Sequence, residues 1–150
     1  MHMHSPAEHK INGAQHDLEM HIVHELIDGP GFEIYKEKIA VIGIILKIAQ
    51  ESHPFVKKLR SEDLGNIDKI NFAELFGELN GVGHGFYHYK GSLTTPPCTD
   101  IVNWNVYSEV LPIQKEHLDH LVGYWKDFNC GHHNFRDCQP LYGRRVVRNF

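Results

Sequence analysis

The sequence predicts an α+β fold, in which several β-strands are accompanied by a few peripheral helices. Three observations favour this class: alternating apolar and polar residues near the N-terminus, a buried-strand pattern at 39–49, and an amphipathic helical pattern at 114–127. With 150 residues, 41% of them hydrophobic, the chain is long enough to bury a core. We therefore expect one domain over residues 1–150.

Residues 1–24 are interpreted as two antiparallel strands with a connection. Residues 1–4 and 18–24 alternate with period two, as half-buried strands do. Between them lies Asn12-Gly13, the preferred dipeptide of a tight hairpin turn. The two strands are therefore expected to lie side by side.

Residues 39–49, with the sequence IAVIGIILKIA, predict a strand buried on both faces. A helix is the competing interpretation, but Gly43 and the β-branched isoleucines favour the strand. Weaker patterns predict short helical turns at 52–60 and 72–79 and further strands at 85–90 and 101–107.

The segment 114–127 is predicted to be an amphipathic helix. Its apolar residues recur at helical spacing and are Leu118, Leu121, Val122 and Trp125. Pro112 comes just before it, as is common at a helix start. This apolar stripe is interpreted as core.

Composition excludes several classes of function. The net charge of -4 and the lack of a basic stripe argue against nucleic-acid binding. The longest apolar run, 39–46, is far shorter than the roughly 18 residues of a membrane span, and residues 1–20 show no signal peptide. The odd set Cys98, Cys130 and Cys138 implies that in an oxidising compartment at least one thiol stays free or pairs outside this segment.

Three histidines form a candidate metal site. His2 and His4 point to the same side of a predicted strand, about 7 Å apart along the backbone, and His21 on the next strand can be brought opposite. Three neutral imidazoles leave one open position on a tetrahedral zinc ion, which is the catalytic pattern. The H-x-H pair alone also fits two surface histidines, so the surrounding sequence decides.

Four stretches resemble α-class carbonic anhydrases, in the same order as in that family. They are MHMHSPAEHKINGAQHDLEMHIVHE at 1–25, KIAVIGIILK at 38–47, GSLTTPPCTDIVNW at 91–104 and NFRDCQPLYGRRV at 134–146. The similarity runs from residue 1 to about 147 and corresponds to the C-terminal portion of the family, with the N-terminal section missing. It implies a mostly antiparallel central sheet with short peripheral helices, in one domain incomplete at its N-terminus.

The resemblance implies a role for each matching residue. His2, His4 and His21 would hold zinc, and Glu19 would accept an N–H from a ligand imidazole. Thr94 would orient the attacking hydroxide by accepting its hydrogen bond, and the Thr94 hydroxyl would donate a hydrogen bond to Glu8. The implied substrate-binding residues are Thr95, Val23, Val41, Leu93 and Trp104. The resemblance gives structural roles to His9, Asn134 and Arg136 and no ligand role to His24, His132 and His133.

The implied activity is that of a zinc hydro-lyase, which converts carbon dioxide reversibly into bicarbonate and a proton. Sulfonamide-type inhibitors are expected to bind. The missing section includes the usual proton-shuttle position, so turnover should fall. The alternative is a non-catalytic subunit that serves assembly in a larger complex. The retained triad, with Glu8 and Thr94, favours the enzyme.

Missing flanking strands would leave sheet edges for another chain or oligomer to cover. Cys98 matches a cysteine that pairs with the N-terminal section in secreted relatives. It suggests a secretory or extracellular ancestry and leaves the compartment open.

Overall fold

The computed structural model describes residues 1–27, 38–57, 59, 85–128 and 133–149, with side chains except at 124–128. Six strands form one sheet in the order β1-β4-β5-β7-β6-β8. Their bounds are β1 His2–His4, β4 Leu18–Glu25, β5 Ile39–Ala49, β6 Phe86–Gly91, β7 Val102–Gln114 and β8 Val147–Arg148. Neighbouring strands are antiparallel except β5 and β7, which are parallel. The predicted α+β class with a mostly antiparallel sheet is confirmed.

The Asn12-Gly13 turn closes a small hairpin of its own. Strands β2 (Lys10–Ile11) and β3 (Ala14–Gln15) pair as a separate two-stranded sheet around this turn. Asn12 and Gly13 have φ values of 51° and 81°, as a type I′ turn requires at both central positions. The predicted tight turn is therefore confirmed, but it lies within the connection between β1 and β4 instead of joining them directly.

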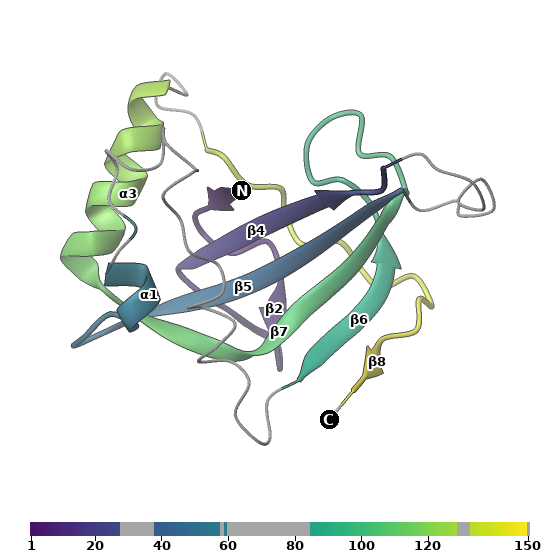
Figure 1. Ribbon diagram of the computed structural model, residues 1–150, viewed down its shortest axis with the longest axis horizontal. Coiled ribbons are helices and arrows are strands. Elements are labelled where there is room, and N and C mark those ends of the chain that lie inside the picture. Colours follow the sequence, from purple (N-terminus) through teal and green to yellow (C-terminus); the bar gives the residue numbers. More distant parts are fainter. Residues whose placement is uncertain (28–37, 58, 60–84, 129–132, 150) are drawn as a thin grey trace.

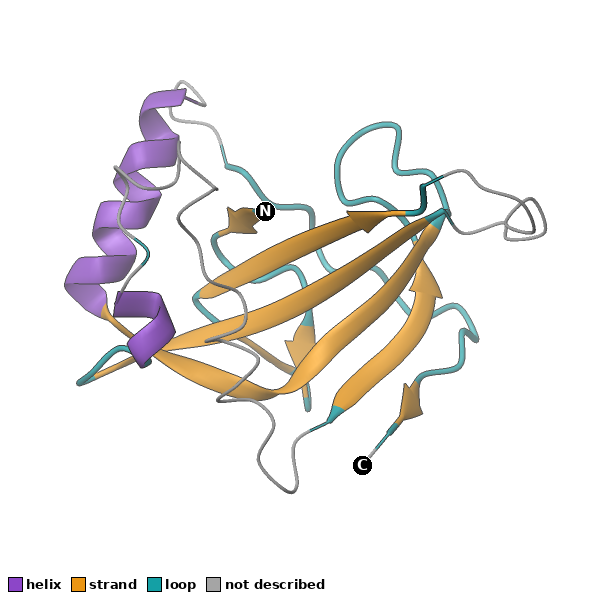
Figure 2. Ribbon diagram, in the orientation of Figure 1, coloured by secondary structure: helices purple, strands orange, loops and turns teal. Residues whose placement is uncertain are grey.

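Two helices lie at one end of the sheet, α1 (Pro54–Lys57) and α3 (Lys115–Phe128), shown in purple in Figure 2. The predicted helix at 114–127 is confirmed within one residue at each end. A short turn within 52–60 is confirmed as α1, whereas the turn expected at 72–79 lies outside the described residues. No helix in the described ranges is long and apolar enough to cross a membrane.

Pro112 comes shortly before α3, as the sequence indicated, but it belongs to a strand. It lies inside β7, which continues through Gln114 directly into α3. Pairing of β7 with β6 reaches only Tyr107, and the Pro112 carbonyl accepts a hydrogen bond from the His53 N–H at 2.8 Å. A proline is tolerated there because this side of β7 has no partner among the described strands, so no ladder bond is lost.

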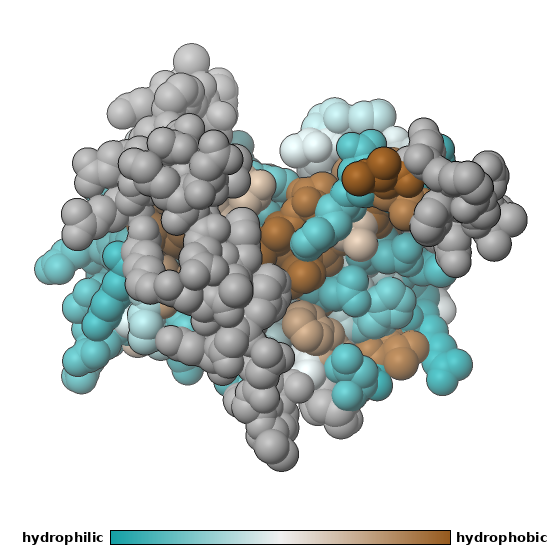
Figure 3. Space-filling view, viewed as in Figure 1, coloured by the Kyte–Doolittle hydropathy of each residue, from teal (hydrophilic) through white to brown (hydrophobic). Residues whose placement is uncertain are grey.

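Apolar residues form a core on each face of the sheet. The core on the helix side consists of Met3, Leu18, Met20, Ile22, Ile44, Leu46, Phe55, Val56, Leu59, Tyr107, Leu111, Ile113, Leu118 and Leu121. The opposite core consists of Ala7, Val41, Ile45, Val102, Trp104 and Val106. Strand β5 contributes to both cores, which confirms that it is buried on both faces. Figure 3 shows hydrophobic residues over the central strands.

The apolar residues of α3 pack into the core as predicted, as far as their side chains are described. Leu118 and Leu121 are buried in the core on the helix side, and Val122 packs against it. The side chain of Trp125 lies outside the described part of the chain. Figure 1 shows the two helices beside the sheet, with the hairpin strand β2 behind it.

Gly43 in β5 lies beside the buried carboxylate of Glu19. A Cβ atom at position 43 would be 3.1 Å from Glu19 Oε1 and 3.5 Å from Val106 Cγ2. A Cβ at Gly123 in α3 would meet nothing within 4 Å. These two glycines therefore make a matched pair in which only the first is limited by packing.

We expect Gly43→Ala to lower the free energy of unfolding by about 1–3 kcal/mol, because the added methyl group overpacks a well-ordered contact. Gly123→Ala should raise it by about 0.5–1 kcal/mol, since alanine favours a helix over glycine. Urea unfolding of both variants measures the difference. Equal stabilisation by both substitutions would contradict the close packing at Gly43.

Candidate metal centre

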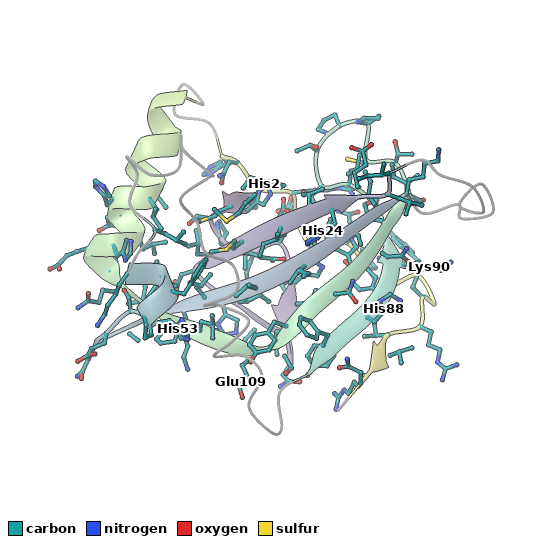
Figure 4. The ribbon with its side chains drawn as sticks, viewed as in Figure 1. His2, His24, His53, His88, Lys90 and Glu109 are labelled. Atoms are coloured by element: carbon teal, nitrogen blue, oxygen red, sulfur yellow. The ribbon has the colours of Figure 1, made fainter. Side chains whose placement is uncertain are left out.

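The register of β1 and β4 brings the three predicted histidines together. His2 pairs directly with His21, and His4 lies two residues further along β1, on the same face. The ring centroids are 4.9 Å apart for His2–His4, 5.1 Å for His2–His21 and 4.7 Å for His4–His21. One nitrogen from each ring lies within 4.8 Å of the other two. Figure 4 labels His2 near the N-terminus and His24 further along β4, on the other face of that strand.

In His4 and His21, one ring nitrogen is hydrogen-bonded to a neighbouring group. The other ring nitrogen of each is unprotonated and points toward the centre of the triad. His21 Nε2 donates to Glu19 Oε1 at 2.8 Å, so His21 Nδ1 faces His2 Nε2 at 3.3 Å. His4 Nδ1 donates to the carbonyl oxygen of Asn134. His4 Nε2 is buried and has no hydrogen-bond partner in the described structure. A buried nitrogen without a partner is costly unless something binds it.

These nitrogens fit a tetrahedral zinc ion. Zinc–nitrogen bonds of 2.0–2.1 Å place two ligand nitrogens roughly 3.3 Å apart, which agrees with the distance between His21 Nδ1 and His2 Nε2. Partial burial, followed by repulsion from His21 and His4, lowers the pKa of His2 from 6.5 to about 4. Burial and His21 also lower the pKa of His4. The His2 and His4 rings are therefore neutral near pH 7, which is the form that binds a metal.

Glu19 is fully buried and accepts four hydrogen bonds. Its Oε2 accepts the backbone N–H groups of Glu8 at 2.9 Å and His9 at 2.8 Å. Its Oε1 accepts from His9 Nδ1 at 2.5 Å and from His21 Nε2. Burial acts to raise the pKa of Glu19, but attraction from His9 and the hydrogen bonds from both histidines hold the pKa well below its ordinary range. The carboxylate is therefore ionised and fixes the tautomer of His21.

Glu8 and Thr94 are not hydrogen-bonded to each other in the described structure. Glu8 Oε1 accepts the Arg136 backbone N–H at 2.6 Å. The other oxygen, Oε2, has no hydrogen-bond partner and lies 3.5 Å from His4 Nε2. The Arg136 contact thus turns the free oxygen of Glu8 toward the imidazoles. Glu8 and Thr94 nevertheless line one cavity of about 340 Å³.

The predicted substrate-binding residues are only partly gathered around the triad. Val41 and Trp104 are buried on the face that bears the triad, and Leu93 packs against them. The Trp104 ring centroid is 4.8 Å from that of His21. Val23 is 42% exposed and Thr95 is exposed, so neither belongs to an enclosed wall.

Asn134 contributes more than the structural role that the sequence implied. Besides its carbonyl contact with His4, its side chain donates to the Met3 carbonyl at 2.9 Å and accepts from the Ser5 N–H at 3.1 Å. These hydrogen bonds therefore hold strand β1, which carries His2 and His4, in its position. The only signal for it in the sequence was its place in the motif at 134–146.

The remaining predicted residues are distributed around the site. His9 is hydrogen-bonded, as expected, to Glu19 and also to Tyr89. Tyr89 had not been singled out from the sequence. Arg136 donates from its guanidinium to Ser92 Oγ at 3.1 Å. Cys98 and Cys138 are free thiols, while Cys130 and His132 lie outside the described residues.

Comparison with known proteins identifies the family of the chain. Residues 1–150 match the sequence profile of the eukaryotic-type carbonic anhydrases. The chain belongs to this family. Alpha carbonic anhydrase 3 of Arabidopsis thaliana is 32% identical over 159 residues, covering 99% of this chain and 51% of the relative. The chain thus spans about half the length of that curated carbonic anhydrase.

Solved carbonic anhydrases share the fold. A halotolerant carbonic anhydrase from Dunaliella salina matches with a TM-score of 0.77 and 28% identity, over 99% of this chain and 59% of that one. The α-carbonic anhydrase of Thermovibrio ammonificans, solved with the inhibitor sulfanilamide, matches with a TM-score of 0.68 and 30% identity, over 97% and 59%. The family resemblance seen in the sequence is confirmed.

The lowered pKa of His2 predicts how the metal-free protein responds to acid. Between pH 6.5 and about 4 the unfolded chain binds a proton at His2 that the folded chain does not. Stability should therefore fall as the pH is lowered through this window. Thermal unfolding in a chelator should show a shallower decline for His2→Gln than for the unaltered protein. Parallel curves would show that His2 does not contribute.

Proposed function

We propose that this chain is a zinc-dependent carbonic anhydrase, which hydrates carbon dioxide reversibly to bicarbonate and a proton. The observation that carries the proposal is the convergence of three imidazole nitrogens, one of them buried and without a hydrogen-bond partner. Family membership over the whole chain supports the same reaction.

The zinc ion would be held by His2 Nε2, His4 Nε2 and His21 Nδ1. Such a site supplies a nucleophile at neutral pH by lowering the pKa of water to about 7, a value established for this enzyme class. The protein's own contribution is to hold the ligand rings. Glu19 keeps the His21 proton on Nε2, and the Asn134 carbonyl keeps the His4 proton on Nδ1.

Glu8 and Thr94 would orient the nucleophile. Glu8 Oε2 is buried, unpartnered and directed at the triad. We propose that the Thr94 hydroxyl donates a hydrogen bond to this oxygen in the working enzyme, so that the Thr94 oxygen accepts a hydrogen bond from the nucleophile. Val41, Leu93 and Trp104 would supply apolar surface for carbon dioxide, and the exposed Thr95 and Val23 would contact substrate from the solvent side.

The open edge of the described sheet bears on turnover. Strand β1, which carries His2 and His4, is an edge strand of the described sheet. We propose that residues 1–150 form one α-carbonic anhydrase-like domain, whose open edge is covered by further polypeptide or by another chain. Without that cover and its proton shuttle, hydration would be slow. The same edge suits the second candidate function, a non-catalytic subunit that serves assembly.

Zinc binding is the first test. Titration calorimetry of metal-free protein should show one zinc ion per chain, and His21→Ala should abolish this binding. Glu19→Gln should weaken it about 10- to 100-fold, because an amide can turn its N–H toward His21 and reverse the tautomer. Failure of the unaltered protein to bind zinc would refute the ligand assignment.

Hydration activity is the second test. Stopped-flow measurement with zinc present should detect hydration above background, sensitive to sulfanilamide, the inhibitor bound by the Thermovibrio ammonificans relative. Thr94→Val should lower kcat/KM about 100-fold through loss of orientation, with exposed Thr99→Val as the control. Bound zinc with hydration at background would instead favour the assembly subunit.

A further inference from the structure

A chain of hydrogen bonds extends from the candidate metal centre to a tyrosine three strands away in the sheet. His21 Nε2 and His9 Nδ1 both contact Glu19 Oε1, and His9 Nε2 is 2.5 Å from the Tyr89 hydroxyl. Tyr89 lies on β6, whereas His21 lies on β4, with β5 and β7 between them. We propose that Tyr89 is a positioning residue for the metal centre, which fixes the tautomer of His9 and thereby the orientation of Glu19.

The ring of Tyr89 is held in place from several sides. It is stacked near Trp104, its partner in β7, with ring planes 7° apart and centroids 6.3 Å apart. The guanidinium carbon of Arg144 lies 5.4 Å from its centroid. Gly91 leaves room for the ring, since a Cβ there would be 2.8 Å from Tyr89 Cε2. These packing contacts therefore hold the Tyr89 hydroxyl in its position beside His9.

The direction of each hydrogen bond follows from the available protons. Burial raises the pKa of Tyr89, so its hydroxyl keeps its proton. If His9 carried a proton on Nε2, the Tyr89 proton would have no acceptor among the described protein groups. The consistent arrangement has Tyr89 donating to a bare His9 Nε2, and His9 donating from Nδ1 to Glu19.

This arrangement makes Glu19 purely an acceptor. Both histidines donate to Oε1 and two backbone N–H groups donate to Oε2, so the carboxylate has a single favourable orientation. Without the tyrosine hydroxyl, only Glu19 holds the His9 tautomer, so the population with the proton on Nε2 rises. In that tautomer the Nδ1 lone pair would face Glu19 Oε1, and repulsion would displace the carboxylate from His21.

The inference rests on the proposed zinc site, but its main test needs no zinc. Nitrogen-15 NMR of histidine-labelled, metal-free protein at pH 8 reports the tautomer of each ring. We expect the Nδ1–H form for His9 and the Nε2–H form for His21. In Tyr89→Phe, His9 should become a mixture of tautomers. Tyr87→Phe is the matched control, because Tyr87 lies on the same strand and lines the same cavity, with its ring near Arg148.

Zinc affinity gives a second measurement. Tyr89→Phe should raise the zinc dissociation constant about threefold to tenfold, less than a residue that bonds a ligand directly. In a His9→Asn background, where the amide donates to Glu19 without help from Tyr89, the same substitution should have little further effect.

Three results would overturn the proposal: a wild-type His9 that is protonated on Nε2, a His9 that is doubly protonated, or a tautomer unchanged in Tyr89→Phe. Circular dichroism checks that the variant folds, and if it does not, the wild-type tautomers decide. If the protein shows the expected tautomers but binds no zinc, the proposed function is refuted, while the role of Tyr89 in fixing the His9 tautomer stands.

Discussion

The buried carboxylate of Glu19 is the constraint around which the site is built. An ionised group removed from water costs several kcal/mol unless hydrogen bonds replace its hydration. Here the donors come from three places: the ligand strand β4, the backbone just after β1, and the His9 ring. The charge therefore ties β1, its connection and β4 into one arrangement. Gly43 on β5 completes it by leaving space for the oxygen.

The two faces of the sheet have different roles: one forms the larger apolar core, and the other carries the candidate site. On the helix side, apolar side chains pack continuously against α1 and α3. On the other face, polar and titratable groups are inserted among Val41, Trp104 and Val106. Because strand side chains alternate, each strand serves both purposes at neighbouring positions. Met20 and His21 illustrate this: one is in the core, and its neighbour is a candidate ligand.

The local sequence was sufficient to predict the strands and the helix that show a clear periodicity, and the residues that lie in motifs. Period-two alternation located β1 and β4, the isoleucine-rich run located β5, and helical spacing located α3. The triad could be proposed because H-x-H on one strand and His21 on the next lie within a stretch that resembles α-class carbonic anhydrases. That Pro112 lies within a strand was not foreseen, because its tolerance there depends on which edge of β7 is paired, and that is a property of the sheet.

The contacts around the ligands could not be found in this way. The partner of His4 is a backbone carbonyl of residue 134, and every residue carries a carbonyl, so its identity leaves no trace in the sequence. Tyr89 was within a predicted strand, but its contact with His9 depends on how β6 is aligned with β7. Glu8 was expected to meet Thr94, yet the Arg136 N–H sets its orientation.

The position of β1 at the edge of the sheet has a kinetic consequence. Two of the three candidate ligands lie on a strand of three residues that is paired on one side only, among the described strands. Edge strands open more readily than central ones, and opening β1 would remove His2 and His4 together. Exchange of the metal with solution would then proceed through detachment of this strand. Anything that pairs with the outer side of β1 would slow the exchange without touching a ligand.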